Sequence, residues 1–293
     1  MNFDDIFDNI SQNQRPHEFI YRHSKPIIRQ FRIKMMAVGT GRICVLIMDM
    51  TLQRNLDKVR RDFVANVSHE LRSPLTALIG FIETLQDTDD IDAHSQQHFL
   101  NIMEEESKRM NRLIDDLISL SRVEVEEHIL PDEHVALDDV VQNVIAILSG
   151  RAEKQDMTIS FDNQITTGTA IIQGETDEIV EVFHNLIENA IKYGTPKSLI
   201  HIGLSYNEAH QLKCEVRNHG EGIEARHIPR LTERFYRVDK ARSRQKGGTG
   251  LGLAIVKHIV NRHRGEMTIT SERGGQTSFA ITFPMLDKKA SSS

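Results

Sequence analysis

The sequence contains few cysteines and no long hydrophobic run. Its two cysteines, Cys44 and Cys214, lie in apolar segments and lack the spacing of a metal site. We therefore interpret both as reduced core residues of a cytosolic protein. The longest apolar run covers residues 43–48 and is far too short to cross a bilayer. No leader with charged, apolar and small-residue regions follows Met1, so no signal peptide is predicted.

An excess of positive charge is also missing. The formal net charge of -6 argues against direct binding to nucleic acid. The 39% of hydrophobic and 27% of charged residues are typical of a soluble globular protein, and a length of 293 suggests two domains. We expect a cytoplasmic location for these residues, with a disordered tail at 287–293. We expect membrane contact only through a region upstream of Met1.

Residues 53–128 follow a helical period. Apolar side chains recur every three or four residues up to Leu85, an acidic break follows at 87–90, and a second run with heptad spacing extends from Phe99 to Leu120. Two such helices joined by a short loop form a hairpin with a narrow apolar seam, and pairing two hairpins into a four-helix bundle buries it. We therefore predict a homodimer. The alternative is that the hairpin packs on the C-terminal domain of its own chain.

The segments on either side of this hairpin contain strands. Residues 1–52 carry two strand-like runs, at 29–38 and 42–49, joined by a turn at Gly39-Thr40-Gly41. After Pro131, helices are expected at 137–148 and 177–193, and strands at 157–161, 200–206, 212–217, 267–271 and 278–283. Helices and antiparallel strands in one region predict an α+β fold, a two-layer sandwich.

The helix expected at 177–193 carries one polar stripe, in which Glu181, Asn185, Asn189 and Lys192 follow one another at helical spacing, with Tyr193 at the edge. Asparagine is a poor helix former, so two of them on one face need a reason. An amide oxygen suits Mg²⁺, and a lysine one turn further suits a phosphate. On this stretch taken by itself, a solvated helix face is an equally good interpretation.

Two glycine segments follow, NHGEG at 218–222 and GGTGLG at 247–252, the second at the start of a helix. Glycines before a helix let backbone N–H groups approach an anion, although a single glycine pair would also suit a simple turn. Residues 223–246 between them are rich in arginine and lysine. A basic surface loop is usually just solvated, but at this position it suggests a mobile lid over a polyphosphate.

A second candidate site lies on the first long helix, within HELRSPLT at 69–76. The imidazole of His69 is largely neutral at pH 7, and its free ring nitrogen is a competent nucleophile. Pro74 leaves the carbonyl of Glu70 without its usual donor, so a bend is expected beside His69. Ser73 lies one turn from His69 and is placed to position a water. A surface histidine with a chance proline is the plain alternative.

Together these motifs resemble the sensor histidine kinases of two-component systems. The runs at 69–76, 185–193, 218–222, 233–237 and 248–252 are similar to their H, N, G1, F and G2 boxes, in the family order. The runs at 60–66 and 231–239 are similar to phosphate-starvation sensor kinases, and residues 47–51 resemble the end of a PAS sensor domain. The implied domains are a partial PAS-like segment at 1–52, a dimerisation hairpin at 53–128 and a GHKL-type ATP-binding domain at 132–286.

The resemblance implies an ATP-dependent protein-histidine kinase with Mg²⁺ as cofactor. His69 would take the γ-phosphoryl group, Glu70 would assist as a base, and Asn189 would bind Mg²⁺. The phosphoryl group would pass to an aspartate of a response regulator, and Ser73 would serve the reverse, phosphatase activity. The residues implied in nucleotide binding are Asn185, Lys192, Tyr193, Asn218, Gly220, Gly222, Gly248, Thr249, Gly250, Leu251 and Gly252.

The main departure from the family is Asn218, where most members have the aspartate that reads adenine. An amide oxygen still accepts a hydrogen bond, but without charge assistance. A loss of about 1 to 2 kcal/mol weakens ATP binding roughly five- to thirty-fold. This leaves open an ATP-weak or kinase-inactive scaffold or phosphatase for a response regulator. A chaperone- or topoisomerase-type ATPase shares the nucleotide boxes but has no use for His69.

Overall fold

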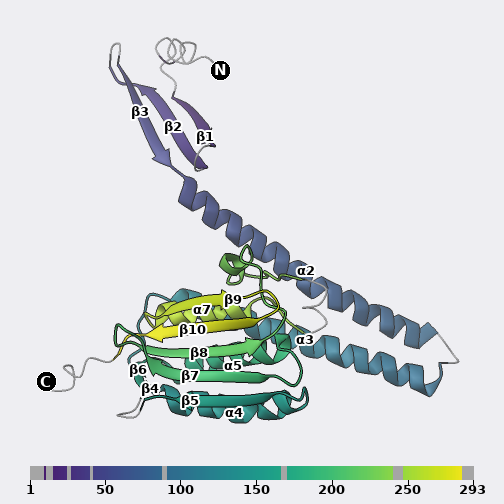
Figure 1. Ribbon diagram of the computed structural model, residues 1–293. Helices are drawn as coiled ribbons and strands as arrows, with labels where there is room; N and C mark the ends of the chain where they lie inside the picture. The colour runs from purple at the N-terminus through teal and green to yellow at the C-terminus, as the bar shows by residue number, and fades with distance from the viewer. Residues whose placement is uncertain are drawn as a thin grey trace. The chain divides into compact units, whose positions relative to one another are not determined.

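The computed structural model describes residues 10, 16–24, 28–39, 42–87, 91–165, 170–239 and 247–285 (Figure 1). The chain divides into two compact units, residues 1–75 and 76–293. The expected tail at 287–293 lies outside the described residues. Among the helices that the structure describes, none combines the length and the apolar character needed to span a membrane.

The first unit begins with a three-stranded antiparallel sheet in the order β1-β2-β3. Its strands are β1 (His17–His23), β2 (Arg29–Ala37) and β3 (Ile43–Asp49). Two of the three were predicted, and β1 was missed. The turn expected at 39–41 extends beyond the described residues. The interpretation of Cys44 as a core residue is wrong, because it is exposed on β3, whereas Cys214 is buried as predicted.

The two long helices have the expected positions. Helix α2 covers Thr51–Asp87 and stays helical through Pro74, and α3 covers Ala93–Glu126. The side chain of Asp92 caps α3 by accepting hydrogen bonds from the backbone N–H groups of His94 and Ser95, each at 3.0 Å. Helix α3 therefore has a capped N-terminus shortly after the acidic break expected at 87–90. Residues 88–90 lie outside the described residues.

Helix α3 packs on the C-terminal domain of its own chain, where its main partner is α7 (Gly252–Arg262). Leu113, Leu120 and Val123 are buried there. The alternative interpretation, in which the hairpin packs on the C-terminal domain of its own chain, therefore holds for α3. Ile114 and Ile118 remain 42% and 64% exposed, so α3 also carries apolar side chains that its own domain does not cover. The homodimer and the domain limits stay predictions.

The C-terminal domain is the expected two-layer α+β sandwich (Figure 1). Its five-stranded sheet has the order β5-β7-β8-β10-β9, in which β5 and β7 are parallel and the other neighbours antiparallel. Helices α4 (Leu137–Glu153), α5 (Thr176–Tyr193) and α7 cover one face. The strands are β5 (Thr158–Asn163), β7 (Leu199–Tyr206), β8 (Leu212–His219), β9 (Glu266–Ser271) and β10 (Gln276–Phe283).

Alternation along the strands decides which face is buried. On β7, Ile200, Ile202 and Leu204 are fully buried while the residues between them are partly exposed. This period of two places every second side chain against the helices. The short paired strands β4 (His134–Ala136) and β6 (Ile171–Gln173) and the 3-10 helix η1 (Ile228–Arg230) were missed, because three residues carry too little periodicity.

Candidate functional site

A cavity of 460 Å³ opens beside the polar face of α5. The opposite face of this helix is its core face, with Ile179, Phe183 and Leu186 fully buried, as the apolar pattern predicts. Asn185, Asn189, Lys192 and Tyr193 all line the cavity. The expected polar stripe is therefore the wall of a cavity and not a solvated surface.

The start of α7 comes very close to α5 at this wall. A Cβ atom on Gly252 would lie 2.4 Å from the side-chain oxygen of Asn185. The Asn185 amide in turn donates a hydrogen bond to the backbone carbonyl of Glu181 at 3.0 Å. A Cβ atom at 252 would therefore force the Asn185 amide to move.

Oppositely charged side chains form ion pairs near the C-terminal end of α5. Glu188 forms ion pairs with Lys192 at 2.9 Å and with Arg151 of α4 at 2.5 Å. Burial acts to raise the pKa of Glu188, but attraction to Lys192 and Arg151 outweighs it and holds this pKa below its ordinary value. Glu188 thus stays ionised and keeps both cations at the cavity wall.

The first glycine segment forms the floor of the cavity at the end of β8. Asn218 is buried, with 4% of its surface exposed, and its amide lies 3.4 Å from the carbonyl of His219 as a donor. Gly220 pairs with Gly194, the residue that ends α5. Gly222 has a φ of 72°, and a Cβ there would lie 1.9 Å from the carbonyl oxygen of Glu272. This close approach permits only glycine.

The second glycine segment is clamped by the residues that precede it in the chain. Arg237 donates to the carbonyl of Thr249 at 2.6 Å, and the backbone N–H of Phe235 donates to the carbonyl of Gly250 at 2.8 Å. Gly248, Thr249, Gly250 and Gly252 line the cavity. Leu251 does not, because its side chain is fully buried beneath the segment. Its expected role in nucleotide binding stays a prediction.

The expected basic lid is only partly described. Arg226 and Arg230 pair with the nearby acids Glu224 and Glu233 on the same segment. Arg234 pairs with Glu124 of α3 at 2.5 Å. Among the basic residues described between 223 and 239, Arg237 alone lines the cavity. Lys240, Arg242, Arg244 and Lys246 lie outside the described residues, so a mobile lid stays a prediction.

The second candidate site lies on α2 in the first unit. His69 and Ser73 are exposed and one helical turn apart, on the same face, while Glu70 is partly buried. Pro74 is buried within the helix. An exposed imidazole on a rigid helix is accessible to a partner that carries a phosphoryl group.

Sequence reasoning missed the contribution of α3 to the cavity. Arg112, Asp115 and Asp116 line it, and so does Arg151 of α4. The carboxylate of Asp116 accepts a hydrogen bond from the hydroxyl of Thr249 at 2.5 Å. No local signal identifies these residues, since polar side chains on an amphipathic helix are unremarkable.

Two family descriptions match the chain in this order. Residues 59–126 match the "His Kinase A (phospho-acceptor) domain", HisKA, and residues 174–287 match the "Histidine kinase-, DNA gyrase B-, and HSP90-like ATPase", HATPase_c. The two matches, in this order, support a two-component sensor histidine kinase. Its HisKA region contains His69, and its HATPase_c region contains the glycine segments and all of α5.

Similar proteins are sensor kinases as well. The sensor protein kinase WalK of Staphylococcus saprophyticus is 38% identical over 84% of this chain and 40% of its own length. WalK of Staphylococcus haemolyticus is 33% identical over 97% of this chain and 47% of its length. The chain thus spans about half the length of these curated relatives. The expected likeness to phosphate-starvation sensors finds no support in them.

Solved structures share the fold. The histidine kinase AdeS of Acinetobacter baumannii has a TM-score of 0.57 and 25% identity, over 75% of this chain and 98% of that one. Histidine kinase ThkA, solved in complex with the response regulator protein TrrA, has a TM-score of 0.62 and 19% identity, over 98% of this chain and 84% of that one. At that identity the second likeness concerns the fold alone.

Proposed function

We propose that this sensor histidine kinase binds ATP in the cavity beside α5 and transfers the γ-phosphoryl group to His69. The observation that carries the proposal is the convergence of the nucleotide-binding candidates on one cavity. Of the eleven residues that the resemblance implies, Leu251 is the exception, and the other ten line it. They come from three separate segments, so their convergence depends on the fold and not on sequence proximity.

Each wall of the cavity has a distinct role in this proposal. The buried Asn218 amide reads the adenine ring on the floor. The backbone N–H groups at the start of α7 face the phosphates, because the first residues of a helix leave their donors unpaired. Lys192 supplies a positive charge, which Glu188 holds in place at 2.9 Å.

The oxygen donors on α5 fit a magnesium ion. Asn189 would hold Mg²⁺ by its amide oxygen, together with phosphate oxygens, and Asn185 and Glu181 offer further oxygens on the same helix face. When bound, the ion supplies charge neutralisation on the phosphates. The protein's own contribution is to hold these oxygens at helical spacing.

On α2, a ring nitrogen of His69 attacks the γ-phosphorus, the bond to the ADP oxygen breaks, and the ring loses a proton. Glu70 adjoins His69 and would accept that proton. The phosphoryl group then passes from the nitrogen to a carboxylate of a response regulator. The fold shared with ThkA, which was solved with such a regulator, is compatible with this partner. In the reverse direction, Ser73 would position the water that dephosphorylates the regulator.

Incubation of the full chain with γ-labelled ATP and Mg²⁺ tests this proposal. We expect label on the wild-type protein and none on His69→Gln. His94→Gln is a matched control, because it changes another exposed histidine, one that does not line the cavity, and leaves the acceptor. Full labelling of His69→Gln would refute the assignment of the acceptor and favour an ATPase of the chaperone or topoisomerase type.

Asn218 favours a second candidate, a kinase-inactive scaffold or phosphatase. Its side chain is an uncharged amide at the buried floor of the cavity, where charge assistance would matter most. The same assay separates the two candidates. No label on wild type, together with label on Asn218→Asp, would select the scaffold.

A further inference from the structure

The wall of the cavity that α3 supplies is tied to the second glycine segment by one contact. Asp116 accepts the hydroxyl hydrogen of Thr249 at 2.5 Å, and the backbone N–H of Leu251 points at the same hydroxyl oxygen at 3.3 Å. Thr249 is otherwise placed to donate to a phosphate, because it lines the cavity three residues before Gly252, the first residue of α7. The hydroxyl has a single hydrogen, so it serves one acceptor at a time.

The charges around Asp116 are unfavourable for a second anion. Burial raises the pKa of Asp116 to about 6, and repulsion by Glu181 and Glu188 adds to this, while the bond from Thr249 and attraction to Lys192 act in the other direction. Arg112 and Asp115 also face the cavity from α3. At neutral pH Asp116 is mostly ionised, so it repels a polyphosphate beside Thr249.

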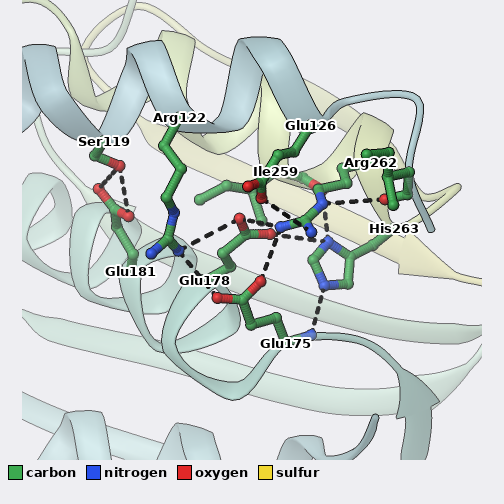
Figure 2. Close-up of polar contacts among 10 residues, drawn as sticks. Ser119, Arg122, Glu126, Glu175, Glu178, Glu181, Ile259, Arg262 and His263 are labelled. Atoms are coloured by element: carbon green, nitrogen blue, oxygen red, sulfur yellow. Dashed lines mark hydrogen bonds and ion pairs between the residues drawn. The ribbon is translucent and has the colours of Figure 1, made fainter. Parts of the chain in front are cut away.

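The face of α3 that carries Asp116 is fastened to α5 and α7 (Figure 2). Ser119 donates to Glu181 at 2.7 Å, and Arg122 pairs with Glu175 at 3.1 Å. Glu126 pairs with Arg262 at 3.1 Å. These three residues follow Asp116 at steps of three or four, so they lie on its side of the helix.

We propose that Asp116 of α3 competes with the phosphates of a nucleotide for the hydroxyl of Thr249, and thereby sets the nucleotide affinity. The inference rests on the proposed ATP site. The contact links the position of the helix that bears the HisKA match to occupancy of the cavity. The phosphates of a nucleotide accept the Thr249 hydrogen bond only in molecules in which the Asp116–Thr249 contact is broken. The apparent nucleotide affinity is therefore reduced by the fraction of such molecules.

Titration calorimetry of the full chain with ADP, and separately with adenosine, tests the inference. Asp116→Ala is expected to bind ADP about five- to tenfold more tightly than wild type, because a charge-assisted bond no longer competes. Adenosine has no phosphates, so its affinity is expected to stay unchanged. Asp116→Asn, which keeps an acceptor without the charge, is expected to fall in between.

Two further variants make the test specific. In a Thr249→Val background, Asp116→Ala is expected to give no additional gain in ADP affinity, as a pairwise interaction requires. Glu105→Gln removes one negative charge from an exposed position of α3 and is expected to leave ADP affinity unchanged. Circular dichroism confirms that each variant retains its helical content.

The outcomes separate this inference from the function on which it rests. ADP binding that Asp116→Ala leaves unchanged would overturn the inference while the proposed ATP site stands. An equal gain for adenosine would also overturn it, since it would indicate general loosening of the cavity. No ADP binding by any variant would overturn both.

Discussion

Replacement of Arg262 by methionine tests how the C-terminal domain stabilises the buried carboxylate of Glu178. The guanidinium of Arg262 is 7% exposed and contacts Glu126, Glu175 and Glu178, as well as the carbonyl of Ile129 at 3.1 Å (Figure 2). Glu178 has no exposed surface at all. In Arg262→Met its remaining partners are Arg122, at 3.5 Å and half exposed, and His263 at 3.8 Å, whose pKa burial lowers.

The expected loss of stability in Arg262→Met follows from leaving the carboxylate of Glu178 poorly paired. Removal of one partner of a buried ion pair costs about 3–5 kcal/mol, because the other charge stays buried. The methionine side chain fills most of the volume of the arginine stem, so a cavity adds little to this cost. We expect Arg262→Lys to lose less than Arg262→Met, and the double variant Arg262→Met/Glu178→Met to recover most of the loss.

The loss of stability in Arg262→Met also depends on pH. Burial raises the pKa of Glu178 above its ordinary value, even against the attraction of Arg262, and the variant raises it further. A carboxyl whose pKa is higher in the folded state takes up a proton that the unfolded state releases, so stability falls as pH rises through that range. The destabilisation of Arg262→Met is therefore expected to be larger at pH 8 than at pH 5.

Thermal unfolding followed by circular dichroism measures this prediction, since the chain has no tryptophan to report by fluorescence. The transition is assigned to the C-terminal domain through its shift on addition of ADP. A loss below about 1 kcal/mol at pH 8, or one that does not change between pH 5 and 8, would refute the view that Glu178 depends on Arg262.

Two further predictions concern the cavity. Gly252→Ala places a Cβ atom 2.4 Å from the side-chain oxygen of Asn185, and we expect it to weaken ADP binding about tenfold. Gly150→Ala, whose Cβ atom would have no heavy atom within 4 Å, should leave the ADP affinity unchanged in the same calorimetric titration. Asp116, whose pKa burial raises to about 6, is expected to make the wild type less stable by about 1–2 kcal/mol as pH rises from 4 to 7. Asp116→Asn should lose this slope in thermal unfolding, and an unchanged slope would contradict the assignment.

The sequence was informative wherever a residue type had to satisfy a backbone requirement. Gly222 and Gly252 were selected as glycines before helices or after strands. A Cβ atom at Gly222 would meet the backbone of Glu272, and one at Gly252 would displace the Asn185 side chain. The polar stripe of α5 was readable because its apolar side, including Phe183, has a clear helical period. The burial of the Leu251 side chain was not readable, because a motif does not reveal which of its side chains turn inward.

Contacts between distant segments were not readable in the same way. Arg262 meets Glu126 and Glu178, which lie 136 and 84 residues earlier, and none of the three belongs to a recognisable motif. Asp116 is equally ordinary in sequence. Such residues acquire a role only when the packing of α3 on the C-terminal domain brings them together, and helix periodicity does not specify that packing.

Helix α3 shows why the two packing alternatives for the hairpin do not exclude each other. Leu113, Leu120 and Val123 form one buried stripe toward the C-terminal domain, whereas Ile114, Ile118 and Val125 remain exposed on other sides of the helix. A heptad pattern reports only that apolar residues recur, and it does not separate two stripes that overlap along the chain. One stripe holds α3 on its own domain, and the predicted homodimer would use the other. Because Asp116 also lies on α3, a shift of this helix away from the C-terminal domain would break the Asp116–Thr249 contact.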